Sequence, residues 1–133
     1  SVCYIGHQAF ANCRSLEDII IPSSVKTIAS CAFTGCSSFV NITIPPSITE
    51  INESVFDGCS SLVNVSIPSS VTLIKMFSFG QCASLKEIIL PPSVTHIEDK
   101  AFFLSLGLEK ISIPSSLNID NVEINRNVEI IRY

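Results

Sequence analysis

The chain has 133 residues, of which 47% are hydrophobic and only 15% are charged. This composition excludes a disordered chain, and the length suits one domain with a real core. The formal net charge of −4 at pH 7 argues against nucleic-acid binding and against adhesion to anionic membranes. No apolar run approaches the roughly 18 residues of a spanning helix, so we expect no membrane insertion.

The chain begins in the middle of a repeat. Prolines recur at one constant interval, at Pro22, Pro45, Pro68, Pro91 and Pro114. At this period Ser1-Val2 aligns with Ser24-Val25, so no polar capping unit precedes the first apolar residues. Because the open end of a repeat array exposes core and strand edges, we expect further repeats before Ser1. The alternative is an end-to-end homodimer through this uncapped N-terminal coil.

Six apolar columns follow the same period as the prolines. One is a phenylalanine column, formed by Phe10, Phe33, Phe56, Phe79 and Phe102. Another is an isoleucine column, formed by Ile5, Ile28, Ile51, Ile74 and Ile97. So many columns fit neither one helix face nor an isolated hairpin. They fit stacked coils whose inward side chains build one continuous core.

Each repeat contains the signals of two extended segments and a tight turn. Residues 62–68, "LVNVSIP", alternate apolar and polar side chains as in a half-buried strand, which the proline ends. Residues 71–74, "VTLI", predict a shorter extended segment on the other side. Residues 55–59, "VFDGC", predict a tight turn or a single helical turn. No copy predicts a long helix.

The period breaks near the C-terminus. Asp120 falls in the buried isoleucine column, so the array is expected to end near residue 117. Val122 and Ile124, then Val128 and Ile130, flank the turn-forming residues 125–127. We therefore divide the chain into a repeat array, residues 1–117 with a partial first repeat, and a C-terminal cap, residues 118–133, with a strand-turn-strand structure.

The repeat pattern resembles a known family. The pattern Leu-x-x-Ile-x-Ile-Pro-x-x-Val-x-x-Ile-x-x-x-Ala-Phe-x-x-Cys is similar to the BspA-like, or treponemal-type, leucine-rich repeat, over residues 1 to about 117. The resemblance implies a mainly β, right-handed leucine-rich repeat solenoid of about five repeats, each of about 23 residues. A parallel sheet would line its concave side, with short strands and turns opposite. It also implies a surface or secreted protein that binds host matrix proteins or other cells.

Four cysteines share one column and raise the question of thiol chemistry. Cys13, Cys36, Cys59 and Cys82 are each one period apart, and Ser105 takes the fifth position. Equivalent side chains on successive coils point the same way, and buried cysteine behaves as a small hydrophobe. We therefore predict packing rather than disulfides. Zinc is disfavoured because it requires converging ligands rather than a row.

No catalytic or metal constellation is recognisable. His7 and His96 occupy different repeat phases, and a metal cluster of Cys3, His7 and Cys13 is a weak candidate. Among the six cysteines, we expect Cys3 to have the most reactive thiol. Known hydrolase, phosphate-binding and zinc-protease motifs are absent. We predict no enzymatic activity and no cofactor.

The outward positions of the strands are the best candidates for a binding surface. They form two columns on the concave side: Asp18, Asn41, Asn64, Glu87 and Lys110, and Ile20, Thr43, Ser66, Ile89 and Ser112. These columns predict a shallow protein-binding face, although they would also suit an idle, solvated scaffold face. Three N-x-Ser/Thr sequences make Asn41, Asn52 and Asn64 candidate glycosylation sites in a eukaryotic secretory pathway.

Together these features predict a non-catalytic protein–protein interaction module. By resemblance, it would belong to a surface or secreted adhesin-like protein that binds host or matrix proteins. An intracellular scaffold is the first alternative, which reduced cysteines would suit. A metal- or thiol-dependent enzyme is a distant one.

Overall fold

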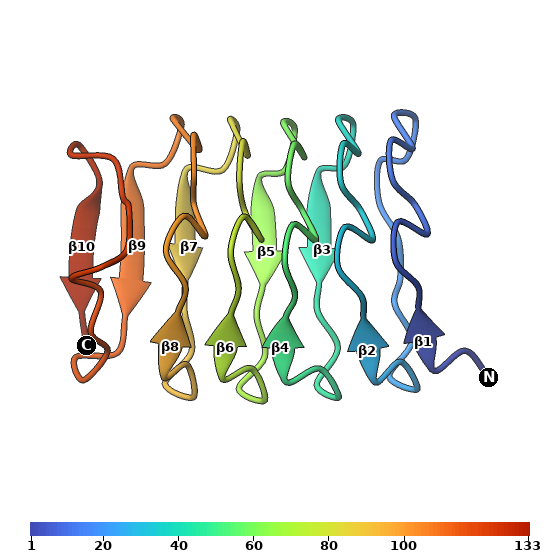
Figure 1. The fold of residues 1–133 in the computed structure, drawn as a ribbon, viewed down its shortest axis with the longest axis horizontal. Helices are drawn as coiled ribbons and strands as arrows, with labels where there is room; N and C mark the ends of the chain where they lie inside the picture. The colour runs from blue at the N-terminus through green and yellow to red at the C-terminus, as the bar shows by residue number, and fades with distance from the viewer.

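The computed structural model describes residues 1–133 as a stack of coils with ten short strands and no helix. The strands form two rows on opposite sides of the stack, and the termini lie at its opposite ends (Figure 1). The first row contains β1 (Tyr4–Ile5), β2 (Thr27–Ile28), β4 (Glu50–Ile51), β6 (Leu73–Ile74) and β8 (His96–Ile97). The second contains β3 (Asn41–Thr43), β5 (Asn64–Ser66), β7 (Glu87–Ile89), β9 (Lys110–Ile113) and β10 (Glu129–Arg132).

Every strand pair is parallel, and the pairs within the repeat array keep its register. Asn41 pairs with Asn64 and Glu87 with Lys110, each one full repeat further along the chain. The same offset relates Tyr4 to Thr27 in the first row. The predicted solenoid with parallel sheets is therefore confirmed.

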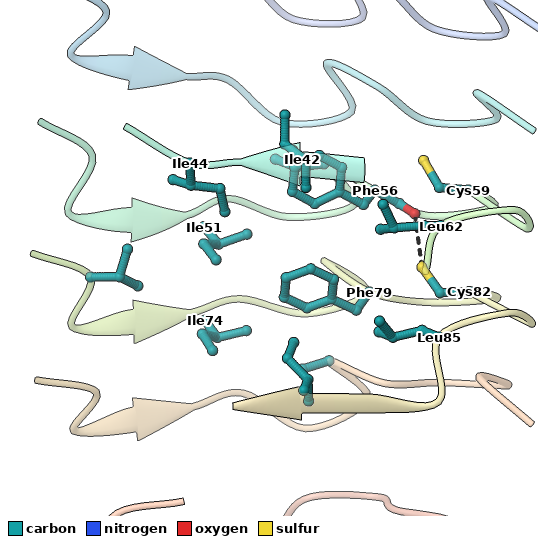
Figure 2. Packing of buried hydrophobic residues seen from close by; sticks show 14 of the residues in the cluster. Ile42, Ile44, Ile51, Phe56, Cys59, Leu62, Ile74, Phe79, Cys82 and Leu85 are labelled. Atoms are coloured by element: carbon teal, nitrogen blue, oxygen red, sulfur yellow. Dashed lines mark hydrogen bonds between the residues drawn. The ribbon is translucent and has the colours of Figure 1, made fainter. Parts of the chain in front are cut away.

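The core is continuous along the stack, as the apolar columns predicted. It consists of a single cluster of 31 buried residues. The rings of Phe33 and Phe56 lie 5.8 Å apart at an interplanar angle of 10°, and those of Phe56 and Phe79 lie 5.6 Å apart at 17°. Figure 2 shows Phe56 and Phe79 of this column between the isoleucines Ile51 and Ile74 on one side and the leucines Leu62 and Leu85 on the other. Because each coil stacks its ring on the next, the aromatic column joins neighbouring repeats.

The predicted tight turns connect the coils by backbone hydrogen bonds. Gly35 and Gly58 have φ values of 74° and 75°, which glycine adopts without strain. In this conformation the Gly35 amide donates to Asp57 O at 2.8 Å and the Gly58 amide donates to Gly80 O at 2.9 Å. The Phe33 amide donates to Val55 O of the next coil in the same way. The turns therefore continue the inter-coil ladder between the two strand rows.

Each row of strands is interrupted once between well-formed pairs. In the second row, β3 pairs with β5 and β7 pairs with β9, but β5 and β7 form no ladder. In the first row, the interruption lies between β2 and β4. At this interruption the Asn52 side-chain amide donates to Ile28 O at 2.7 Å. One repeat later, the backbone amide of Lys75 makes the corresponding bond to Ile51 O at 3.0 Å. A side chain thus replaces a ladder bond.

The last coil is shorter than the others and corrects part of the cap prediction. β10 pairs with β9, and Glu129 lies opposite Lys110, which is less than one repeat earlier in the chain. The predicted strand at Val122 and Ile124 is wrong, whereas β10 includes Ile130 but not Val128 of the second predicted strand. This segment lies against the turn after β8 rather than against a strand, since the Glu123 amide donates to Asp99 Oδ1 at 3.2 Å. The exposed Asp120 cannot continue the isoleucine column.

The shorter last coil leaves the turn of the fifth coil uncovered. The backbone amides of Lys100, Phe102 and Leu104 have no acceptor, whereas their equivalents in earlier coils donate to the following coil. Leu104 and Leu106 are both exposed here. The equivalent positions in the other coils carry polar or small residues: Asn12, Gly35, Gly58 and Gln81, and Arg14, Ser37, Ser60 and Ala83.

Candidate protein-interaction face

The ten residues predicted for binding lie together on one side of the solenoid. We call this surface the strand face: the outward side chains of β3, β5, β7 and β9, together with Asp18 and Ile20 of the first coil. Asp18 joins the row through a parallel bridge to Asn41. Eight of the ten side chains are exposed, and Lys110 and Ser112 are half-buried. The alternation of the strands therefore directs these residues outward, as predicted.

Two isoleucines are the most unusual residues on the strand face. Ile20 is 93% exposed and Ile89 is 63% exposed. Between them, the same column contains the short polar residues Thr43 and Ser66. Since three coils of about 4.8 Å separate the two isoleucines, they lie roughly 14 Å apart along the stack.

Two shallow hollows run along this face. The first has a volume of about 450 Å³, and its wall includes Asp18, Ile20, Asn41 and Thr43. The second has a volume of about 400 Å³ and continues from Asn41 and Thr43 across β5 to β7. The two hollows share Asn41 and Thr43 as wall residues, so they are neighbours along the strand face. We call them together the groove, with Ile20 lining one hollow and Ile89 the other.

The groove has a neutral polar centre and an acidic group near each end. At the centre, the Asn64 side-chain amide donates to Asn41 Oδ1 at 2.8 Å. Asp18 lies two residues before Ile20, and Glu87 lies two residues before Ile89. Neither carboxylate has a hydrogen-bond or ion-pair partner in the protein. Both ends therefore present a free carboxylate beside an exposed isoleucine.

The interruption between β5 and β7 lies within the second hollow. The amides of Ile67 and Lys86 donate to no backbone acceptor there. Val65 is partly exposed, whereas its equivalents Ile42 and Ile88 are buried. Val65 lines the second hollow, so part of the core is accessible at the floor of the groove.

Of the charged side chains near Glu87, some form ion pairs and others do not. Lys86 contacts Glu109 at 2.7 Å on the surface, and the hydrogen bond and positive charge of Lys86 lower the pKa of Glu109. Lys110 is the register neighbour of Glu87, but no salt bridge joins them. The Glu87 carboxylate is therefore unpaired, with the Lys110 side chain on the neighbouring coil beside it.

The three candidate glycosylation sites have different surroundings. Asn41 and Asn64 are exposed on the strand face, where they bond to each other. Asn52 is half-buried on the opposite side, where its amide donates to Ile28 O and its Oδ1 accepts from Lys75 Nζ at 3.0 Å. A glycan on Asn41 or Asn64 would occupy the groove. One on Asn52 would disturb the contact between two coils.

The cysteine column packs within the core, with one exception. Cys36, Cys59 and Cys82 are buried and free, whereas Cys13 is exposed because no coil stacks on its outer side. Burial raises the pKa of Cys59 and raises that of Cys82 to about 12. Each buried thiol donates to a phenylalanine carbonyl of the preceding coil, as Cys82 does to Phe56 O at 3.3 Å (Figure 2). Their environment disfavours the reactive thiolate.

The remaining polar candidates form no metal site. The structure contains no group of three histidine, cysteine or acidic side chains that could hold a metal ion. His7 Nδ1 instead hydrogen-bonds Ser30 O at 2.8 Å. Cys3 is exposed, as expected of a reactive thiol. The structure also contains no helix that could cross a membrane.

Sequence reasoning missed a polar network on the first row of strands. Lys75 Nζ lies 2.8 Å from Glu50 Oε2 and also contacts Asn52. It also missed a third hollow, of about 460 Å³, between Phe102–Leu106 and Glu123–Asn127. The unusual residues of the fifth turn, Leu104 and Leu106, were the available signal for this hollow.

Comparison with known proteins identifies the repeat family. The model of the BspA-type leucine-rich repeat region matches residues 3–130 in six copies. The chain belongs to this family. The six copies include the shortened last coil, so the repeat pattern continues through much of the segment that we assigned to a cap.

Solved structures of bacterial leucine-rich repeat proteins resemble the chain. A leucine-rich cell surface protein from Faecalibacterium prausnitzii A2-165 is 30% identical, with a TM-score of 0.78 over 88% of this chain and 32% of that one. A leucine-rich repeat protein from Bacteroides ovatus ATCC 8483 is 27% identical, with a TM-score of 0.76 over 98% and 43%. The T. pallidum leucine-rich repeat protein is 27% identical, with a TM-score of 0.70 over 87% and 51%.

The chain thus spans 32% to 51% of the length of these proteins. No curated protein matches the chain in sequence. Leucine-rich repeat solenoids are typically protein-interaction modules and generally non-catalytic scaffolds.

Proposed function

We propose that this chain is the protein-binding part of a surface or secreted adhesin-like protein, and that it binds matrix proteins through the strand face. The observation that carries the proposal is the groove of two neighbouring hollows with the exposed Ile20 and Ile89 in its walls, because exposed isoleucines have no role in the core. The cell surface assignment of the F. prausnitzii protein supports the location. An intracellular scaffold remains the alternative, because all six cysteines are unpaired.

A biosensor panel of purified extracellular-matrix proteins would test this function. The strand-face variant is Ile20→Thr with Ile89→Ser, which takes residues found elsewhere in the same column. The matched control is Leu104→Asn with Leu106→Ser, which also removes two exposed apolar side chains but lies at the turns. We expect binding to at least one matrix protein that weakens about tenfold or more in the first variant only. Binding to none, or equal binding by both variants, would contradict the proposal.

Segment 118–133 is proposed to act as the cap of the array. Val122, Ile124, Val128 and Ile130 pack against the core, and β10 covers β9. Deleting residues 118–133 should therefore expose the fifth coil and promote aggregation, as measured by light scattering. A soluble, equally stable truncated chain would remove this role.

An end-to-end homodimer is also proposed, through the first coil. Val2 and Tyr4 are each 58% exposed there, and a second copy would cover them. Light scattering at high concentration should give a dimer that Val2→Ser with Tyr4→Ser converts to monomer. A wild-type monomer at high concentration would contradict the homodimer.

A further inference from the structure

The strand face contains two pairs that each combine an acidic side chain with an isoleucine. In the first coil, Asp18 precedes Ile20 by two residues, and in the fourth coil Glu87 precedes Ile89 by two residues. Residues two apart on a strand point to the same side, so each isoleucine has a carboxylate beside it. The intervening coils carry only uncharged polar side chains in these two columns, Asn41, Thr43, Asn64 and Ser66.

The four side chains are free to engage a partner. Both isoleucines are among the exposed large hydrophobic residues, and neither carboxylate is paired. A ligand that brings a cation to each carboxylate and an apolar side chain to each isoleucine would satisfy both ends. Since the negative ends attract positive charge, the groove selects against acidic ligands.

The spacing of the pairs restricts the conformation of the ligand. The pairs lie roughly 14 Å apart along the stack, which matches four residues of an extended chain at about 3.4 Å each. In a helix, four residues span only about 6 Å. The groove is also shallow and open along its length, which suits a single extended segment rather than a folded domain.

We propose that the strand face binds an extended, basic segment of a partner protein, with two apolar–basic residue pairs whose apolar side chains are four residues apart. The apolar side chains pack against Ile20 and Ile89, and the basic side chains lie against Asp18 and Glu87. Between them, the peptide backbone contacts the polar centre at Asn41 and Asn64. This inference rests on the proposed protein-binding function of the same face and specifies its partner.

Fluorescence anisotropy with a labelled synthetic peptide tests the inference. The probe contains two Val-Lys pairs separated by Ser-Thr, within flexible Gly-Ser flanks. One control peptide replaces each lysine by glutamate, and a second places the two pairs side by side without the spacer. We expect the probe to bind, and both controls to bind at least about tenfold more weakly.

Matched protein variants locate the binding. Asp18→Asn with Glu87→Gln removes both groove carboxylates without changing their shape, and we expect about three- to thirty-fold weaker binding and a smaller salt dependence. Glu53→Gln with Glu123→Gln removes two carboxylates that lie elsewhere and should leave binding unchanged. Equal affinity for the lysine and glutamate probes, or equal loss in both variants, would overturn the inference.

The experiments distinguish failure of the proposed matrix-protein binding from failure of the proposed extended, basic ligand. If a matrix protein binds through Ile20 and Ile89 but no lysine probe does, the strand face is a binding site and the basic, extended ligand is wrong. If the lysine probe binds with the expected dependence but no matrix protein does, the ligand chemistry stands and the matrix assignment falls. If neither binds, both are wrong.

Discussion

The Ser105 hydroxyl donates a hydrogen bond to Phe79 O at 2.5 Å, as the Cys82 thiol donates to Phe56 O in the coil before it. Cys59 makes the equivalent bond to Phe33 O at 3.2 Å. The column therefore requires a small side chain with a donor, and a thiol and a hydroxyl both fulfil this role.

A first prediction follows for Cys59. Cys59→Ser should change the free energy of unfolding by no more than about 1 kcal/mol, because the hydroxyl keeps the bond to Phe33 O. Cys59→Leu retains an apolar side chain but overfills the column, so it should cost about 1–3 kcal/mol. Urea denaturation measures both. A serine variant as unstable as the leucine variant would show that the sulfur itself is required.

A second prediction concerns thiol reactivity. At pH 8 in the native state, iodoacetamide should label Cys3 and Cys13 first, since both are exposed. Cys82 should stay unlabelled, because its pKa of about 12 leaves very little thiolate at that pH. Raising the pH toward 12 should raise its thiolate fraction, although access still requires opening of the core.

Intact mass before and after alkylation gives the readout. Alkylation in urea should add six groups, which agrees with six free cysteines. Fewer than six added groups without reductant would reveal a disulfide. Rapid native labelling of Cys82 would contradict its burial.

A third prediction concerns the contact between the second and third coils. Asn52→Ala removes the amide that bonds Ile28 O and the oxygen that accepts from Lys75. We expect a loss of about 1–3 kcal/mol in the free energy of unfolding, since Ile28 O and Lys75 each lose a partner. The exposed Asn121 makes no side-chain bond, so Asn121→Ala is the control and should be nearly neutral. Equal effects of both variants in thermal unfolding would refute the role of Asn52.

A fourth prediction compares two glycines. A Cβ on Gly107 would overlap the Ala83 carbonyl oxygen, whereas one on Gly6 would lie 3.6 Å from a Tyr4 side-chain atom. Gly107→Ala should therefore destabilise by more than about 2 kcal/mol, because backbone must move. Gly6→Ala should be tolerated, and the next coil has Ala29 at this position. Similar melting temperatures of the two variants would contradict the close packing at Gly107.

Most of the fold was predictable because every coil carries the same apolar residue types at the same repeat positions. Val25, Phe33 and Phe39 recur at fixed spacing with their equivalents, and only a stacked coil buries all of them at once. The outward direction of Asn41 and Thr43 followed from the alternation of a strand. These predictions needed no knowledge of contacts between distant residues.

The features that the sequence did not predict depend on how neighbouring coils meet. Asn52 occupies the same repeat position as Ala29 and Lys75, which have different side chains. The repeat pattern therefore gave no sign that the Asn52 amide bonds Ile28 O of the preceding coil. The interruption between β5 and β7 likewise leaves the period intact. At the C-terminal end, Val122 and Ile124 alternate as in a strand, but no partner strand lies beside them. A strand pattern forms a strand only where a neighbour completes its hydrogen bonds.

The most direct test of the central claim is hydrogen–deuterium exchange of the chain with and without a matrix protein that binds it in the panel. We predict slower exchange in peptides that contain residues 18–20, 41–43, 64–66 and 87–89, because the partner covers the strand face. Protection confined to the opposite row, at residues 27–28, 50–51, 73–74 and 96–97, would contradict the strand face as the binding site.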